Sequence, residues 1–387
     1  MKELIIFLKK FISRILIFIN KPNFSSESYY SYSKDVKKLV DNINNLLSKK
    51  IKIFKGNYMN FLDSNLSYNL RENYTNIISK IIDTNTEKLN DFQIDNEYRK
   101  ILNNIKDEGY ASSVNLNIDS VKVKNIHNHL SSLQKYPGHI ISNSNRPTKH
   151  NLKNSKFITY HPKDLLKSND ICEILFDKKL ISIASSYFSC LPTCITLNCY
   201  WQNALNQQDY NPQYFHRDNH DLKLLTYFIF LTDTNTLDGG HEYIKYSNNL
   251  ENFNNRLDIE IKDKINAILK KKYNISNSSE DNLLYLFFQL DKNGYGHEDI
   301  YDELKKYKIE LFGESGSGFL TDNYGVHRAV APLTKPRLIF WVSFGLFNNQ
   351  NSKRLPERLK IKSLNNDDNN KNFSVLKYVY RNYIKFS

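Results

Sequence analysis

Two histidines, an aspartate and an arginine have the types and spacing most suited to chemistry in this chain. His216 and Asp218 are separated by one residue, and His327 follows 109 residues after Asp218. Arg337 lies ten residues beyond His327. Side chains alternate between the faces of a strand, so His216 and Asp218 should share a face while Arg217 points away. With His327 alongside, two imidazoles and one carboxylate would form the ligand set of non-heme Fe(II) oxygenases.

Both ends of this constellation lie in sequence typical of short strands. Residues 222–231 are rich in β-branched and aromatic side chains, and residues 241–246 follow a Gly-Gly turn. Turns containing Gly, Pro or Asn separate the further predicted strands, which cover residues 319–322, 326–330 and 337–344. Several short strands divided by such turns predict a double-sheet jelly roll.

Two blocks of the sequence resemble the phytanoyl-CoA dioxygenase family. The first block, residues 195–247, contains His216-Arg-Asp218 and Gly239-Gly-His-Glu-Tyr-Ile244. The second, residues 313–347, contains Val326-His327-Arg328 and Arg337-Leu-Ile-Phe-Trp. The resemblance implies a mainly β fold with added α, built on a double-stranded β-helix (a cupin-like jelly roll). It also implies that His216, Asp218 and His327 bind Fe(II) and that Arg337 pairs with a carboxylate of 2-oxoglutarate.

The implied chemistry explains these residue types. Three protein ligands leave three positions on an octahedral iron, of which the 2-oxo acid takes two and O2 the third. The far carboxylate of 2-oxoglutarate needs a planar, bidentate partner, and guanidinium supplies this better than ammonium. Related halogenases have a small residue in place of the carboxylate ligand. Asp218 therefore favours hydroxylation over halogenation.

The sequence departs from the family pattern at two positions near the expected co-substrate. Some branches place a hydroxyl residue two positions after the arginine, where this chain has Ile339. The second partner of the carboxylate is then expected elsewhere, with Asn198 and Thr226 as the two candidates. His241 stands after Gly240 where Pro is more usual, which is interpreted as a loop variation.

The remaining histidines are interpreted as ordinary residues. His127 and His129 follow Asp119 on a predicted amphipathic helix, where a spacing of two directs the rings apart and disfavours a second metal site. Three others are predicted to be loop histidines: His139, His220 and His241. The four cysteines lack the C-x-x-C spacing of zinc sites, so reduced core thiols in a cytoplasmic protein are expected. They are Cys172, Cys190, Cys194 and Cys199.

The chain divides into three predicted parts. Residues 1–95 form a helical N-terminal extension, 96–347 the jelly-roll domain, and 348–387 a basic, Asn-rich C-terminal tail. Helical periodicity covers residues 33–47, 66–82, 91–105 and 372–385.

A long insertion, residues 248–312, separates the two motif-bearing blocks. Residues 259–273 and 298–307 within it have helical patterns. Long insertions are often functional, so this segment is predicted to cover the iron site and help select the substrate.

Charge is concentrated in the two termini of a chain with net charge +13. Residues 1–20 carry four positive side chains and one negative, and residues 348–387 carry nine positive and three negative. A nucleic-acid groove would need Lys and Arg interleaved with aromatic residues in the folded core. The sequence has no such stripe, so nucleic-acid binding is not expected.

Residues 1–20 are predicted to form an amphipathic helix. Its longest apolar runs, 4–8 and 15–19, contain five residues, far below the ~20 needed to span a bilayer. No small-residue cleavage site follows, so a cleaved signal peptide is not expected. Two interpretations stay open: the helix lies on an anionic membrane surface, or it packs on this chain or on a second copy. The oligomeric state is not determined by the sequence.

The sequence therefore predicts an Fe(II)- and 2-oxoglutarate-dependent dioxygenase that hydroxylates an unactivated carbon of a small organic substrate, using O2 and releasing succinate and CO2. The first alternative is a jelly-roll binding protein that keeps the metal ligands but lacks turnover. The second is a metal-dependent cupin-type isomerase, which would gain nothing from Arg337. No motif in the sequence identifies the substrate.

Overall fold

The computed structural model describes most of the chain beyond residue 95. The described residues are isolated positions between 72 and 86, then 96–138 (without 113, 115 and 117), 155–204, 213–218, 221–273, 298–346, 359–361 and 371–386. The described positions between 72 and 86 are helical, in part within the predicted helix 66–82. The predicted helices 1–20 and 33–47 lie outside the described residues. Within the described part, no helix is long and apolar enough to cross a membrane.

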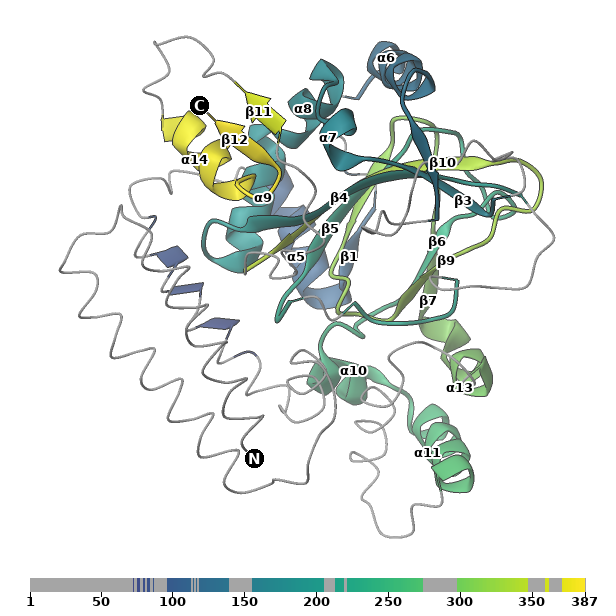
Figure 1. Cartoon of the computed structure of the whole chain (residues 1–387). Coiled ribbons are helices and arrows are strands. Elements are labelled where there is room, and N and C mark those ends of the chain that lie inside the picture. Colours follow the sequence, from purple (N-terminus) through teal and green to yellow (C-terminus); the bar gives the residue numbers. More distant parts are fainter. Residues whose placement is uncertain are drawn as a thin grey trace, which may run out of the picture.

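A seven-stranded antiparallel sheet forms the centre of the molecule (Figure 1). Its strands, in spatial order, are β1 (Tyr110–Ala111), β8 (Gly318–Thr321), β5 (Leu225–Phe230), β10 (Arg337–Gly345), β4 (Thr193–Gln202), β3 (Phe157–Tyr160) and β2 (Lys135–Pro137). The interior strand β5 is buried along its whole length. After Leu225, its sequence LTYFIF consists of the β-branched and aromatic types that suit a covered sheet.

A three-stranded antiparallel sheet faces the large sheet. It consists of β7 (Lys308–Leu311), β6 (His241–Ile244) and β9 (His327–Ala329). Leu311 of β7 packs with Phe228 and Phe319 of the large sheet in one buried cluster. The predicted strands are confirmed here with small shifts at their ends. β6 stops at Ile244, two residues before Tyr246, which has a positive φ of 66°.

Helices cover the other face of the large sheet (Figure 1). They are α5 (Asn96–Glu108), α6 (Ser120–Ser131), α7 (Pro162–Leu165), α8 (Asn169–Leu175) and α9 (Lys178–Phe188). Asp119 caps α6 by accepting a hydrogen bond from the Lys122 amide at 2.8 Å, as favoured at helix N-termini. After α5, Gly109 has a φ of 87°, and a Cβ there would lie 2.2 Å from the Tyr243 hydroxyl. This position therefore requires glycine.

The described part of the insertion is helical, and its buried side chains form one cluster with Phe215, Ile244 and Val326. It contains α10 (Leu250–Arg256), α11 (Ile259–Tyr273), α13 (Glu298–Glu303) and a 3-10 turn, η3 (Leu304–Tyr307). The predicted helix 259–273 is confirmed, whereas 298–307 divides into α13 and η3. The predicted insertion boundary at 312 differs from the structure, because β7 pairs with β6 and belongs to the small sheet. Sequence periodicity alone does not reveal this long-range pairing.

The described part of the C-terminal segment, 359–361 and 371–386, packs on the main core. Helix α14 (Lys371–Val379) is followed by β12 (Ile384–Phe386), which pairs in parallel with β11 (Leu359–Ile361). The predicted helix 372–385 is therefore too long. The chain turns after Val379, so that the Tyr380 hydroxyl donates to the Leu175 carbonyl and the Tyr383 hydroxyl donates to Ile195 O at 3.0 Å.

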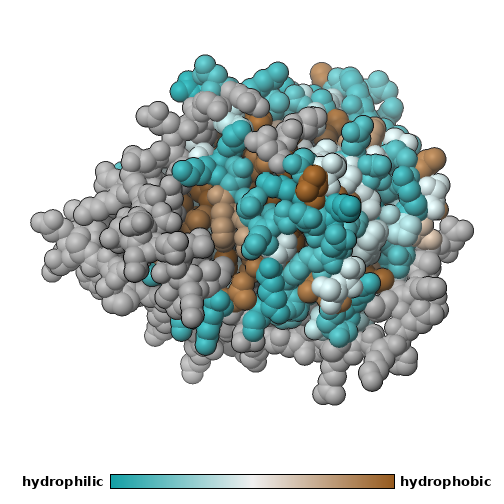
Figure 2. All heavy atoms as spheres, turned by 90° about the horizontal axis from the view of Figure 1, so that it is seen from above, coloured by the Kyte–Doolittle hydropathy of each residue, from teal (hydrophilic) through white to brown (hydrophobic). Residues whose placement is uncertain are grey.

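The surface seen in Figure 2 is largely hydrophilic, with apolar side chains in small groups. Among the described residues, the large apolar side chains that are exposed are Val121, Leu237, Ile259, Phe312 and Leu333. The four cysteines have free thiols.

Candidate metal centre

His216, Asp218 and His327 meet at one point beside the small sheet. Their potential ligand atoms all lie within 4.8 Å of one another. The Nε2 atoms of His216 and His327 each lie 3.8 Å from a different carboxylate oxygen of Asp218. Atoms this close can share one metal ion, so the structure brings together the three residues that the sequence singled out.

The backbone holds the two histidines side by side. His216 and His327 form an isolated antiparallel bridge, with N–H···O hydrogen bonds of 2.9 Å in both directions. The segment containing His216 is therefore attached to β9 at a single point and is not the regular strand that the sequence predicted. The Asp218 amide instead donates to Asn323 O at 2.9 Å. Asp218 is thus positioned by the turn that precedes β9.

Both imidazoles are oriented by backbone carbonyls. His216 Nδ1 lies 2.7 Å from Tyr214 O, and His327 Nδ1 lies 2.9 Å from Gly325 O. A carbonyl oxygen only accepts, so each Nδ1 carries the hydrogen and each neutral ring keeps its lone pair on Nε2. Such outer hydrogen bonds commonly fix the tautomer and orientation of metal-binding histidines.

Asn323 orients the carboxylate of the third residue. Its Nδ2 donates to Asp218 Oδ2 at 2.8 Å, and its Oδ1 accepts from the Thr321 hydroxyl at 2.6 Å. From the sequence, Asn323 could be predicted only as a turn residue, and the role of its side chain could not. Its proximity to Asp218, 105 residues earlier, depends on the tertiary fold.

Arg337 begins β10 and is 1% exposed. Its NH1 donates to the carbonyls of Gly239 and Gly240, the latter at 2.9 Å, and its NH2 donates to Gln202 Oε1. No carboxylate in the described part of the chain forms an ion pair with it. Burial lowers the pKa of Arg337, an effect opposed by the adjacent Tyr200. A buried charge without a counter-charge is costly, so this position favours an anionic ligand.

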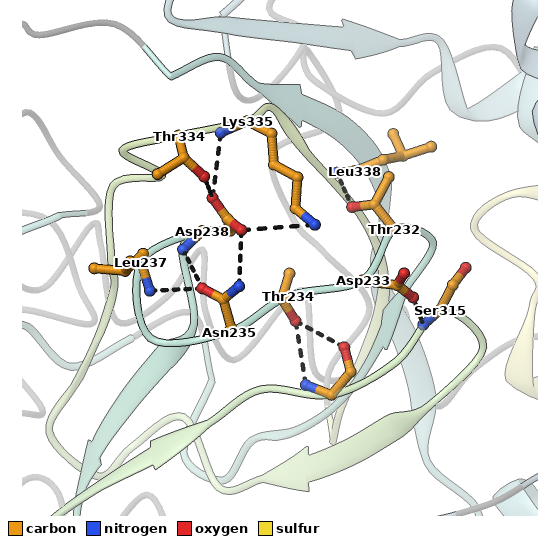
Figure 3. Close-up of polar contacts among 11 residues, drawn as sticks. Thr232, Asp233, Thr234, Asn235, Leu237, Asp238, Ser315, Thr334, Lys335 and Leu338 are labelled. Atoms are coloured by element: carbon orange, nitrogen blue, oxygen red, sulfur yellow. Dashed lines mark hydrogen bonds and ion pairs between the residues drawn. The ribbon is translucent and has the colours of Figure 1, made fainter.

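Figure 3 shows a network of polar contacts around Asp238, the residue before Gly239, whose carbonyl accepts from Arg337. Asp238, which directly precedes Gly239, accepts from the Thr334 hydroxyl, from the Lys335 amide at 3.2 Å and from Asn235 Nδ2 at 2.9 Å. These contacts, the Thr334 hydroxyl foremost, lower the pKa of the Asp238 carboxyl. The turn before β6 is thereby tied to the turn before β10.

His241 corrects one prediction. It is not a solvated loop residue but a buried residue of β6, 4% exposed. Its ring stacks on His327, with centroids 5.3 Å apart and an interplanar angle of 19°. Phe228 and Phe319 lie against the same ring, at 5.0 and 5.3 Å. The alternation of β6 turns this side chain into the space between the sheets, which a single Gly-Gly-His sequence does not indicate.

The other histidines lie apart from the metal centre or outside the described residues. His127 and His129 are on α6, as predicted, and their Nε2 atoms lie 2.6 Å from Leu231 O and 2.8 Å from Asp164 O. Both therefore have structural hydrogen bonds. His139 and His220 belong to segments that the structure does not describe.

The register of β10 places the two candidate co-substrate contacts away from Arg337. Asn198 lies opposite Trp341, and Thr226 lies opposite Ser343, with which its hydroxyl shares a hydrogen bond of 2.9 Å. Both share the inner face of the sheet with Arg337 but sit four and six residues further along β10. Gln202 is the residue directly opposite Arg337. The role of Asn198 or Thr226 towards a co-substrate stays a prediction.

No protein-family model and no curated protein matches the sequence. Solved structures similar to the chain include iron-bound EctD from S. alaskensis, at 12% identity over 77% of this chain and 89% of that one, with a TM-score of 0.40. The epimerase SnoN in complex with Fe3+, alpha ketoglutarate and nogalamycin RO is 12% identical over 64% and 83%, with a TM-score of 0.39. HygX from Streptomyces hygroscopicus, with nickel, 2-oxoglutarate and hygromycin B bound, is 13% identical over 68% and 90%, with a TM-score of 0.38. Scores of this size establish no common fold or function.

Proposed function

We propose that this chain is an Fe(II)- and 2-oxoglutarate-dependent dioxygenase of the phytanoyl-CoA dioxygenase type, with its two facing sheets forming a double-stranded β-helix. It hydroxylates an unactivated carbon of a small organic substrate and releases succinate and CO2. The observation that carries this proposal is the pairing of a two-histidine, one-carboxylate centre with Arg337, a buried cation that lacks a counter-charge in the described chain.

The donor set fits Fe(II). Two imidazoles and one carboxylate converge from one side, so the remaining coordination positions are left for small ligands. His216 and His327 present lone pairs on Nε2 because their Nδ1 atoms donate to carbonyls. Asn323 holds the Asp218 carboxylate in place.

When bound, iron supplies the activation of O2 that accompanies oxidative decarboxylation of 2-oxoglutarate. The chain's own residues position the reactants. Arg337 binds the distal carboxylate through its planar fork. Phe228 and Phe319, both buried, lie beside His241 and exclude water from the space between the sheets.

The decisive experiment measures iron content and 2-oxoglutarate decarboxylation together. The purified chain should bind one Fe(II), lose it to a chelator, and release CO2 from 2-oxoglutarate without added substrate. A His216→Ala, Asp218→Ala double variant should lose both properties. Full iron occupancy in the double variant would refute the metal assignment. Iron binding without decarboxylation would instead favour a binding protein that lacks turnover.

A further inference from the structure

Three buried side-chain nitrogen atoms, two from the paired strands β4 and β10 and one from β6, have no hydrogen-bond partner in the described part of the chain. They are Arg337 Nε and Gln202 Nε2, which are donors, and His241 Nε2, which donates in one of the two neutral tautomers. The Tyr200 hydroxyl also lies against the guanidinium. Buried donors nearly always form hydrogen bonds in proteins, and a buried donor without one is costly. Gln202 lies directly opposite Arg337, and Gly240, the residue before His241, accepts from Arg337, so one missing acceptor could satisfy all three nitrogen atoms.

Gln202 is fixed by its contact with the guanidinium. It is fully buried, directly opposite Arg337 in the β4–β10 ladder, and its Oε1 accepts from Arg337 NH2. The reversed amide orientation would set donor against donor. Its Nε2, with two hydrogens, is therefore directed to something other than Arg337.

His241 connects this position to the metal centre. The carbonyl of the preceding residue, Gly240, accepts from Arg337 NH1 at 2.9 Å. The ring of His241 itself stacks on His327 on one side and contacts Phe228 of the large sheet. A dicarboxylate that reaches from the metal to Arg337 must pass this ring.

We propose that Gln202 and His241 act with Arg337 as a three-residue cradle for the distal carboxylate of the 2-oxo acid. They supply the donors that the hydroxyl residue provides in family branches where this chain has Ile339. This inference rests on the proposed function. It assigns Gln202 and His241, rather than Asn198 or Thr226, as the further carboxylate partners.

The test is calorimetric binding of two 2-oxo acids to the Mn(II)-loaded chain, in which no turnover interferes. 2-Oxoglutarate carries the distal carboxylate, whereas 2-oxopentanoate keeps only the metal-chelating end. The dissociation constant of 2-oxopentanoate divided by that of 2-oxoglutarate therefore measures recognition of the distal carboxylate. Gln202→Leu and His241→Phe should each reduce this ratio about tenfold or more, since each removes a hydrogen bond to a charged group. Affinity for 2-oxopentanoate should stay within about twofold, because the metal-chelating end is unchanged.

A matched histidine variant is His129→Phe on α6, which should leave both affinities unchanged. If Arg337→Leu abolishes the preference for 2-oxoglutarate while Gln202→Leu and His241→Phe retain it, the cradle is wrong and the proposed function stands. If Arg337→Leu also retains the preference, the proposed role of Arg337 fails. If His241→Phe weakens the binding of both acids equally, His241 acts at the metal-chelating end, and its assignment to the cradle is wrong.

Gln202→Glu provides a variant that should fold even if an apolar replacement does not. Its carboxylate can keep the hydrogen bond with Arg337 NH2 and adds the missing counter-charge. The melting temperature should be retained or raised, and 2-oxoglutarate should lose its preference over 2-oxopentanoate. A stable Gln202→Glu chain that still prefers 2-oxoglutarate as the unmodified chain does would overturn the inference.

Discussion

At the residue scale, the candidate metal centre is organised by the partners of its ligands. His216 and His327 each donate Nδ1–H to a carbonyl two residues earlier, at 2.7 and 2.9 Å. The same local geometry therefore directs Nε2 of each histidine towards the metal position. Asp218 depends instead on a side chain far away in sequence, Asn323. The carboxylate is thus the ligand whose orientation is most open to disruption.

Replacing Asn323 with Ala should weaken metal binding about 10- to 100-fold, as loss of an outer-shell partner typically does. The reason is that Asp218 Oδ2 loses its 2.8 Å hydrogen bond and the carboxylate can rotate. Titration of the apoprotein with Mn(II) measures the effect. Asn203→Ala, which removes a side-chain hydrogen bond to Ser155 O, is the control. Equal metal affinity in the two variants would contradict this role for Asn323.

Arg337→Lys tests the guanidinium while keeping the charge. Lysine cannot form a bidentate pair with a carboxylate, and one charge-assisted hydrogen bond contributes about 1.5–3 kcal/mol. The KM for 2-oxoglutarate in uncoupled decarboxylation should therefore rise about tenfold to hundredfold. An unchanged KM would mean that another residue holds the carboxylate.

At the element scale, the helical insertion is joined to the metal-bearing segment. Phe215, next to His216, is buried in the core that α10, α11 and α13 form. The Tyr301 ring of α13 packs on Phe215, with ring centroids 4.5 Å apart. On the β9 side, Cζ of Arg328 lies 4.4 Å from the Phe215 ring centroid. The insertion therefore supports the segment that carries His216 and Asp218. This adds a positioning role to its predicted role over the iron site, which stays a prediction.

Tyr301→Ala should destabilise the chain and weaken its metal binding. Loss of a buried aromatic ring typically costs about 3–5 kcal/mol, and here the ring lies against the residue before His216. Urea unfolding and Mn(II) titration measure the two effects. Tyr301→Phe keeps the ring and loses the 3.4 Å hydrogen bond to Phe215 O, so its metal affinity should be nearly normal. Normal metal affinity in Tyr301→Ala would show that the insertion does not position the metal ligands.

At the scale of the whole molecule, the ends of the described chain converge on one core. Residues of α5, the large sheet and the C-terminal segment belong to a single buried cluster. Arg381 donates to the Thr193 hydroxyl at 2.6 Å, and Asn382 donates to Cys194 O at 2.9 Å, both at the start of β4. The opposite end of β4 carries Gln202. Stability of the C-terminal segment and of the candidate site should therefore be coupled.

Tyr380→Ala should lower the free energy of unfolding by about 3–5 kcal/mol, because the side chain is fully buried and large-to-small core changes cost this much. Fluorescence and far-UV circular dichroism should report one shared urea transition, as expected for a cooperative unit. Lys377→Ala, on the exposed side of α14, should change stability by less than about 0.5 kcal/mol. A separate early transition in the Tyr380→Ala chain would show that the C-terminal segment unfolds independently.

Local sequence patterns predicted five of the strands, several helices and the residue types that carry the chemistry. Strand periodicity located β5, β8, β9 and β10, and the spacing of His216, Asp218 and His327 indicated a metal centre, because both signals are local or depend on residue type. The tertiary structure decided the rest. It placed Gln202 opposite Arg337 and Asn323 against Asp218. It buried His241 and packed the C-terminal segment into the core. These features depend on strand register and long-range packing, which no local pattern specifies.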